Sequence, residues 1–219
     1  MQAVRDAITA AAIEAGRATD GVILLAVSKT FAPEAIREAC RAGQTRFAES
    51  YVQEALHKIA ALRDLPIEWH YIGPIQGNKT RAIAENFAWV HSLDRLKIAE
   101  RLSAQRPAHL PPLQVCLQVN ISGENSKSGV PPGEAARLAM QVAHLPHLRL
   151  RGLMAIPEPS GKVAAQRLPF AQLRELFEQL NRQGLQLDTL SMGMSHDFAA
   201  AIAEGATMVR VGSAIFGQR

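Results

Sequence analysis

A lysine stands directly after a short, continuously apolar run near the start of the chain. The run Val-Ile-Leu-Leu-Ala-Val at residues 22–27 is followed by Ser28-Lys29-Thr30. A lysine is uncommon in this place, because taking an ammonium group out of water is costly. Partial burial can lower the pKa of Lys29, so that its neutral amine forms a Schiff base with an aldehyde. The alternative is a lysine whose stem is buried and whose charge reaches solvent, and position alone favours neither.

Two later segments combine small residues with hydrogen-bond donors. They are Leu-Ser-Met-Gly-Met-Ser at residues 190–195 and Arg-Val-Gly-Ser at residues 210–213, where Arg210 is expected to point inward. Small residues let backbone N–H groups approach a ligand, and the N-terminus of the helix predicted from Asp197 favours an anion. A turn with a serine cap would have a similar composition. The coincidence of both segments with Lys29 favours a phosphorylated aldehyde as the ligand.

The elements that must position these residues alternate along the chain. Short apolar runs typical of buried strands separate longer amphipathic runs typical of helices. About eight strands, nearly all separated by helices, indicate either a closed parallel barrel or an open doubly wound sheet. The number of strands favours the barrel. We therefore predict a single α/β domain over residues 1–219, a (β/α)8 barrel of the TIM type. Active residues in such a barrel gather after the strands. Strands are predicted at residues 22–27, 46–48, 68–72, 88–92, 113–120, 148–154, 189–191 and 208–211, and helices at residues 1–18, 34–42, 51–62, 79–86, 93–104, 133–144, 163–182 and 197–204.

Composition narrows the class of protein. With 47% hydrophobic and 20% charged residues the chain can bury a sizeable core, and no apolar run approaches the length of a membrane span. The net charge of +4 comes from scattered basic residues and aromatics are only 5%, so we expect no nucleic-acid partner. The N-terminus lacks the pattern of a secretory signal, and Cys40 and Cys116 are expected to be buried thiols in the cytoplasm.

The histidines give no sign of a metal site. His144 and His147 have no carboxylate partner in sequence, so no metal is expected there. His70 and His91 follow strand-like residues and are interpreted as core histidines with satisfied hydrogen bonds. His196 is expected to begin a helix and at most to lie beside a phosphate.

Seven segments, spread almost from end to end, resemble the pyridoxal phosphate homeostasis proteins. They are long and stand in the same order as in that family, so the resemblance is specific. It implies a protein that binds pyridoxal 5′-phosphate and passes it to apoenzymes. We expect this protein to be a monomer in the cytoplasm, without a membrane or nucleic-acid partner. The segments are Ala26–Thr30, Trp69–Lys79, Gln118–Ser122, Glu124–Gly129, Arg151–Pro157, Leu190–Ser195 and Met208–Gly217.

The resemblance also implies a fold like the barrel domain of bacterial alanine racemase and a role for each site residue. Lys29 would be the Schiff-base lysine, Arg210 would face the pyridine nitrogen, and Met194 would line the same pocket. The residues expected around the phosphate are Ser191, Gly193, Ser195, Gly212 and Ser213.

The chain departs from the family pattern at three positions. Ser50 replaces an asparagine expected near the cofactor, which puts an amide contact there in doubt, and Gly77 stands where a serine is frequent. Ser213 replaces a threonine and keeps the hydroxyl donor. Lys79 and Lys127 lie in predicted loops, where each is either a solvated charge or part of a second anion or aldehyde site.

A carrier and an enzyme remain the competing functions for such a barrel. An arginine at the ring nitrogen stays protonated, which makes the ring a weaker electron sink, although alanine racemase has an arginine there too. Racemases of the related fold take a catalytic tyrosine from an additional β-domain, and only Tyr51 and Tyr71 are present here. We therefore expect a carrier, not an enzyme. The alternatives are a weakly active amino-acid racemase or decarboxylase and, more distantly, a phosphosugar enzyme without the cofactor.

Overall fold

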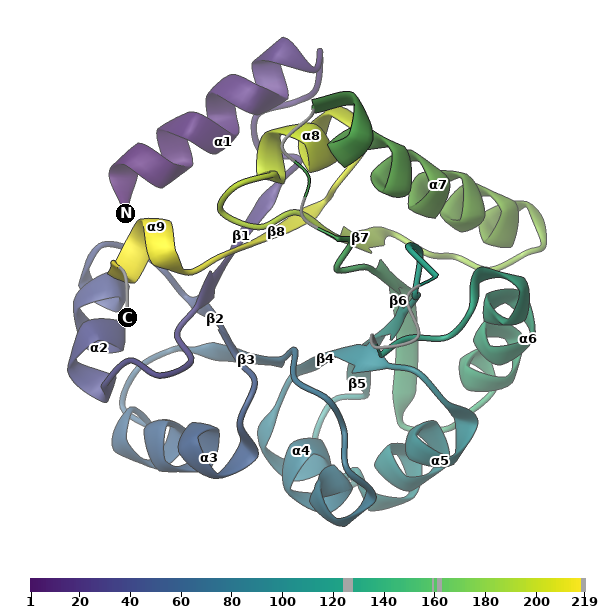
Figure 1. The fold of residues 1–219 in the computed structure, drawn as a ribbon. Coiled ribbons are helices and arrows are strands. Elements are labelled where there is room, and N and C mark those ends of the chain that lie inside the picture. Colours follow the sequence, from purple (N-terminus) through teal and green to yellow (C-terminus); the bar gives the residue numbers. More distant parts are fainter. Residues whose placement is uncertain (124–127, 159, 161–162, 218–219) are drawn as a thin grey trace.

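Eight parallel strands close into a barrel in the computed structural model, which describes residues 1–123, 128–158, 160 and 163–217. Each strand is hydrogen-bonded to its neighbours in chain order, and β1 pairs with β8 to close the ring (Figure 1). The strands are β1 (Ile23–Val27), β2 (Arg46–Glu49), β3 (Glu68–Tyr71), β4 (Trp89–Leu93), β5 (Leu113–Gln118), β6 (Leu148–Met154), β7 (Thr189–Ser191) and β8 (Met208–Val211).

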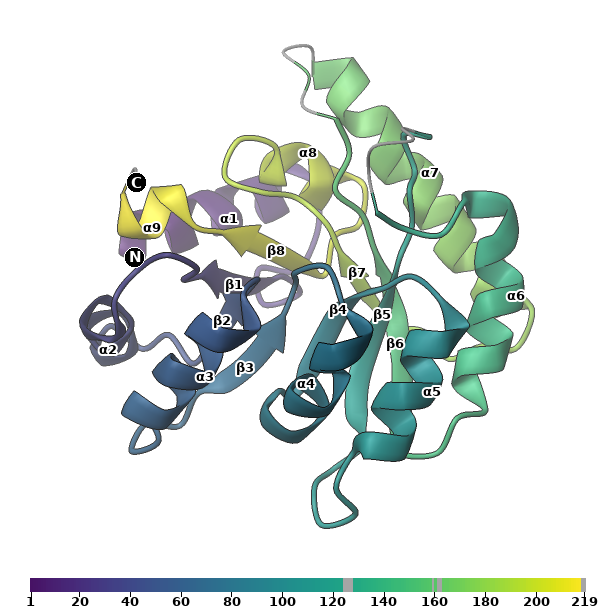
Figure 2. The same ribbon diagram turned by 60° about the horizontal axis from the view of Figure 1, so that its bottom comes forward.

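The helices surround the strands on the outside of the barrel (Figure 2). Their apolar faces and the outward side chains of the strands form the main hydrophobic core. The helices are α1 (Gln2–Glu14), α2 (Pro33–Arg41), α3 (Val52–Ala61), the 3-10 turn η1 (Gly77–Lys79), α4 (Thr80–Asn86), α5 (Leu96–Gln105), α6 (Pro132–Ala143), α7 (Val163–Arg182), α8 (Phe198–Ala203) and α9 (Ser213–Phe216).

The predicted (β/α)8 barrel is confirmed, with differences at the ends of several elements. The helix predicted at residues 1–18 ends at Glu14, and the strand predicted at residues 113–120 ends at Gln118. The helix predicted from Leu93 begins only at Leu96, because β4 continues to Leu93 and Arg95 has extended backbone angles (φ −157°, ψ 147°). The four-residue helix α9 was not predicted, since it is too short to show a helical period. Pro33 begins α2, because its fixed φ suits the first helical position and its missing N–H is not needed there.

The apolar run of β1 is continuous because both faces of the strand are buried. Ala26 belongs to the core between barrel and helices, whereas Leu25 and Val27 pack with Ala48 and Met208 in a separate cluster inside the ring. Successive side chains of a strand point to opposite faces, so this alternation follows from strand geometry. A strand buried on both faces loses the polar alternation of a surface strand.

The inside of the ring also holds polar side chains. His70 on β3, His91 on β4, Ser191 on β7 and Arg210 on β8 are all buried. Both ring nitrogens of each histidine have a hydrogen-bond partner. The interpretation of the two histidines as satisfied core residues is therefore confirmed. Among the residues that the structure describes, no helix combines the length and the apolar character needed to cross a membrane.

Candidate functional site

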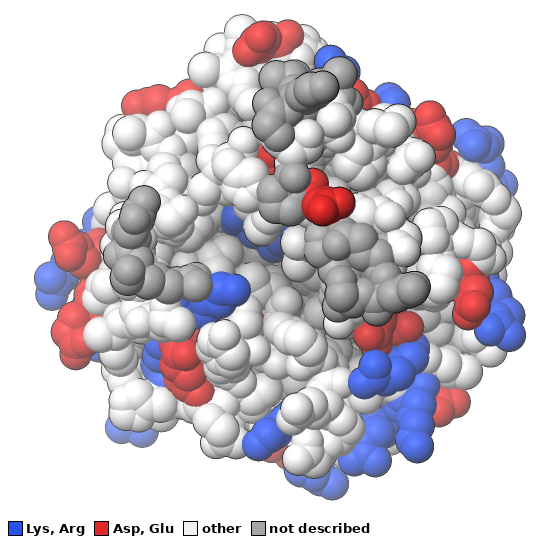
Figure 3. Space-filling model, viewed as in Figure 1, with Lys and Arg blue, Asp and Glu red and all other residues white. Residues whose placement is uncertain are grey.

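A cavity of about 560 Å³ opens at the carboxyl-terminal mouth of the barrel. Its walls come from the ends of β1 and β8 and from the segments that follow β1, β2, β3, β6, β7 and β8. Figure 3 shows the hollow at the centre of this face, with basic side chains inside it. Lys29 and Arg210 both line the cavity, so the structure brings the predicted strand-1 lysine and strand-8 arginine to one site.

Lys29 lies between two firmly held residues. The backbone N–H of Ser28 donates to the Ala48 carbonyl (3.0 Å), and the Ser28 hydroxyl donates to Glu49 Oε1 (2.6 Å). On the other side, the N–H of Thr30 donates to Glu54 Oε1 (2.6 Å), and Thr30 has a φ of +71°. A β-branched residue rarely adopts this left-handed backbone conformation. The contacts on both sides fix the direction in which Lys29 leaves the strand.

A buried lysine holds this arrangement together. Lys58 Nζ donates to the Ser28 carbonyl (2.8 Å), Glu49 Oε1 (2.8 Å) and Glu54 Oε1 (2.5 Å). The Lys58 and Glu49 side chains are 3% and 0% exposed, so this ion pair is desolvated. Burial raises the pKa of the Glu49 carboxyl, while the hydrogen bonds from Lys58 and Ser28 oppose that rise.

Replacing Lys58 with Met is expected to destabilise the fold by about 3–5 kcal/mol, because it leaves the Glu49 carboxylate buried without its cation. The folded-state pKa of Glu49 lies above its unfolded value, so stability is lost as pH rises through the folded pKa. In urea unfolding, the stability deficit of Lys58→Met against the wild type should therefore grow as the pH rises. Lys97→Met, at an exposed position of α5, is the control and should change stability by less than about 0.5 kcal/mol. A deficit below about 1 kcal/mol for Lys58→Met would contradict this role.

Arg210 is tied into the floor of the cavity. Its Nη1 donates to the carbonyl (2.5 Å) and hydroxyl (2.9 Å) oxygens of Ser191, and its Nη2 donates to the Ala155 carbonyl (2.8 Å). Burial lowers the pKa of the Arg210 guanidinium to about 10, while the nearby Asp197 carboxylate opposes the shift. Arg210 therefore remains a cation at neutral pH.

Four of the residues predicted beside Arg210 line the cavity with it: Met194, Ser195, Gly212 and Ser213. The Ser213 hydroxyl donates to Ser195 Oγ across 3.2 Å, which joins the segments after β7 and β8. Their two hydroxyls and the small Gly212 leave one wall of the cavity polar and open to a ligand.

Ser191 and Gly193 lie behind the cavity wall. The Ser191 hydroxyl is fully buried and contacts His91 Nδ1 (2.8 Å) as well as Arg210. Gly193 has a φ of +91°, and a Cβ there would lie 2.6 Å from the Ala201 Cβ, so only glycine lets β7 turn against α8. Its carbonyl accepts from the Arg210 N–H (2.9 Å). Both residues support the site from behind.

Several other residues from the sequence analysis have a defined place. Ser50 and His196 line the cavity, so the departure from the family asparagine falls within the site. His196 is exposed and precedes α8, which begins at Phe198. Lys79 lies in η1, outside the cavity wall, and Lys127 lies outside the described residues. Cys116 is buried as expected, whereas Cys40 is only partly buried.

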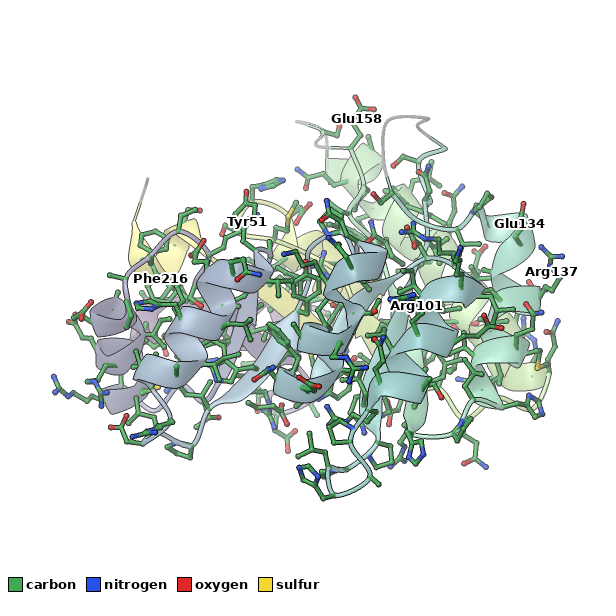
Figure 4. All side chains as sticks on the ribbon, turned by 90° about the horizontal axis from the view of Figure 1, so that it is seen from below. Tyr51, Arg101, Glu134, Arg137, Glu158 and Phe216 are labelled. Atoms are coloured by element: carbon green, nitrogen blue, oxygen red, sulfur yellow. The ribbon has the colours of Figure 1, made fainter. Side chains whose placement is uncertain are left out.

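The rim of the mouth is partly aromatic. Phe31 lines the cavity and stacks on Phe216 with ring centroids 5.0 Å apart. Tyr51 lies on the outer surface of this side of the barrel (Figure 4) and is 56% exposed. The Tyr71 hydroxyl is turned toward the carbonyls of Ser50 (3.2 Å) and Pro74 (3.1 Å), and burial raises its pKa to about 12. Neither tyrosine lines the cavity.

The supporting cluster of Glu49, Glu54 and Lys58 was not identified from the sequence. Glu54 and Lys58 stand four residues apart on a helix, a spacing that is also typical of a solvated surface pair. The only available signal was Glu49 at the end of a predicted strand, where active residues of a barrel gather.

Comparison with known proteins places this chain in a family. The family model described as "Alanine racemase, N-terminal domain" matches residues 5–219. The pyridoxal phosphate homeostasis protein of Pseudomonas aeruginosa is 64% identical over 212 residues, which cover 97% of this chain and 91% of the relative. The protein of the same name from Escherichia coli K12 is 54% identical over 219 residues, covering 99% and 94%.

Solved structures agree with the sequence comparisons. PipY of Synechococcus elongatus, solved without pyridoxal phosphate, superposes with a TM-score of 0.86 at 40% identity, over 96% of this chain and all of that one. The same protein with pyridoxal phosphate bound gives a TM-score of 0.84. Alanine racemase of Corynebacterium glutamicum, at 18% identity and a TM-score of 0.70, shares the fold. This chain therefore belongs to the pyridoxal phosphate homeostasis protein family, which has the alanine racemase N-terminal domain fold.

Proposed function

We propose that this chain binds pyridoxal 5′-phosphate in the cavity at the carboxyl-terminal mouth and acts as a carrier that stores and delivers it inside the cell. The observation that carries the proposal is the convergence of Lys29, Arg210 and the two serine hydroxyls on one cavity. The names of the relatives and the cofactor in PipY support it.

The chemistry of the donor set fits this cofactor. A volume of about 560 Å³ lies in the range typical of small-molecule sites. Lys29 supplies an amine, and the bound cofactor supplies an aldehyde with which that amine condenses to a Schiff base and one released water. On the opposite wall, Ser195, Gly212 and Ser213 offer donors for a phosphate, with Ser191 and Gly193 supporting them from behind.

Arg210 and Met194 complete the proposed assignment. Arg210 is a buried cation that lines the cavity. It would face the ring nitrogen of the cofactor, where a cation disfavours protonation of that nitrogen. The ring would then withdraw electrons only weakly, which suits storage better than catalysis. Met194 would supply an apolar contact in the same pocket.

The acid–base groups of the cavity also favour a carrier. The titratable side chains that line it within the described residues are Lys29, His196 and Arg210. Efficient removal of an α-proton needs a poised base and a partner acid at the reacting atom. His196 adjoins Ser195 on the proposed phosphate side, and Tyr51 and Tyr71 lie outside the cavity wall. A weakly active racemase or decarboxylase is the competing function.

The discriminating experiment separates delivery from turnover. Purified protein loaded with the cofactor is mixed with an unrelated apoenzyme that needs it, and in parallel with a panel of amino acids in deuterated water. We expect the apoenzyme to gain activity and the α-protons to exchange far more slowly than the roughly 1–1000 per second typical of enzymes. Exchange within that range would establish a racemase-like activity and overturn the carrier role. Failure of the protein to take up the cofactor would overturn the whole proposal.

A further inference from the structure

A line of buried polar side chains crosses the inside of the barrel, from the cofactor cavity to the opposite mouth. It begins at Arg210 Nη1, which contacts Ser191 Oγ (2.9 Å), and Ser191 Oγ contacts His91 Nδ1 (2.8 Å). His91 Nε2 contacts His70 Nδ1 (2.9 Å), and His70 Nε2 contacts Glu68 Oε1 (3.0 Å). We call these five residues the barrel chain.

The far end of the barrel chain belongs to a second cavity. Glu68 lines a hollow of about 660 Å³ at the amino-terminal mouth, together with Arg46 and Trp89. The Glu68 side chain is 40% exposed and also accepts from Arg46 Nε (3.1 Å). The His70 ring stacks on Trp89 with centroids 5.4 Å apart, which fixes its orientation. The barrel chain thus connects the two mouths and passes between the apolar clusters of Leu25 and Val27 and of Trp89 and Met154.

The charges at the two ends determine the direction of every hydrogen bond. Hydrogen bonds from His70 lower the pKa of Glu68, so it is an ionised acceptor, and burial lowers the pKa values of both histidines, so each is neutral. A neutral imidazole carries one N–H. His70 must donate from Nε2 to Glu68 and accept at Nδ1.

The directions of the hydrogen bonds nearer Arg210 follow from the neutral charge of His91. His91 must donate from Nε2 to His70 and accept at Nδ1. The donor to His91 Nδ1 is the Ser191 hydroxyl. The Ser191 oxygen then accepts from Arg210. All four hydrogen bonds therefore run one way, from the buried cation to the distant carboxylate, and polarise one another.

We propose that Glu68, His70 and His91 are positioning residues that act through Ser191 to hold Arg210 in its orientation at the floor of the cofactor cavity. The link to the cofactor rests on the proposed function, whereas the link to Arg210 does not. The Asp197 carboxylate raises the pKa of Arg210, and it lies at the start of α8, outside the barrel chain. The barrel chain supplies the restraint from the inside of the ring.

The first test uses the protein without cofactor. Imidazole nitrogen chemical shifts at pH 7 should show both His70 and His91 as neutral rings protonated at Nε2. Glu68→Gln keeps the shape of the side chain and removes its charge. In that variant the side-chain N–H groups of Arg210 should exchange with solvent about tenfold faster than in the wild type. Glu85→Gln removes a carboxylate from the same hollow outside the barrel chain and should leave the exchange unchanged.

A second readout uses the loaded protein. Loss of the Glu68 charge should shift the pH midpoint of the cofactor's visible absorption change by about half a pH unit, because the Arg210 cation beside the cofactor is then held in a different position. Glu85→Gln should keep the wild-type midpoint. Nδ1-protonated histidines, or equal Arg210 exchange in Glu68→Gln and wild type, would overturn the positioning role. If the cofactor fails to bind, this result counts against the proposed function. The exchange rates of Arg210 then test the positioning role of the barrel chain by themselves.

Discussion

Lys29→Ala is expected to lack the visible absorption band that we expect of the wild-type protein loaded with pyridoxal phosphate. The reason is that the remaining contacts, from Ser195, Ser213 and Arg210, can hold the cofactor only by non-covalent bonds. We expect the apparent dissociation constant to rise by about 100-fold or more, which corresponds to roughly 2.7 kcal/mol. Absorbance titration and equilibrium dialysis measure the two effects separately.

Two matched variants sharpen this experiment. Lys29→Arg keeps a cation at the end of β1 but removes the condensing amine, so it should also lack the band. Lys97→Ala removes an exposed lysine of α5 and should keep the wild-type band and affinity. An intact band in Lys29→Ala would show that another amine holds the cofactor.

Ser195→Glu is expected to produce the second largest loss of cofactor binding. Ser195 lines the cavity and contacts Ser213 Oγ, so a glutamate would fill the wall and place a carboxylate beside the proposed phosphate. Loss of the donor alone is worth about 1.5–3 kcal/mol, because the acceptor is charged. Steric exclusion and charge repulsion add to it, and we expect affinity to fall by at least about 100-fold.

A graded series distinguishes these contributions. Ser195→Ala removes only the hydroxyl and should weaken binding by at least about tenfold, but by less than Ser195→Glu does. Gln179→Glu adds the same negative charge at an exposed position of α7 and should leave binding unchanged. Equal affinities for wild type and Ser195→Glu in an equilibrium titration would show that the phosphate does not bind at this wall of the cavity.

The fold could be predicted from the sequence because the spacing of the apolar residues differs between strands and helices. Strands buried on both faces appear as unbroken apolar runs, as in residues 22–27, and the helices between them carry one apolar face. The first and last residues of the helices were harder to predict than the helices themselves. The start of α5 depends on the extended backbone at Arg95, which no local sequence pattern indicates.

The site was predictable only where residues stand directly after strands. Lys29, Ser195, Gly212 and Ser213 could be placed at the mouth for that reason. Burial of charged groups could not be predicted, since the spacing of Glu54 and Lys58 also suits a surface pair. Nor could the sequence reveal that Ser191 turns toward His91, because that contact joins residues 100 positions apart.

Borohydride reduction of the loaded protein followed by peptide mass spectrometry determines whether Lys29 is the residue that holds the cofactor. Cleavage after glutamate is well suited, because it places each lysine in a separate fragment: Lys29, Lys58, Lys79, Lys97, Lys127 and Lys162. We expect the fragment of residues 15–34, whose single lysine is Lys29, to carry the added mass of the reduced pyridoxyl phosphate group. An unmodified 15–34 fragment, with the label on the fragment that contains Lys79 or Lys127, would contradict it.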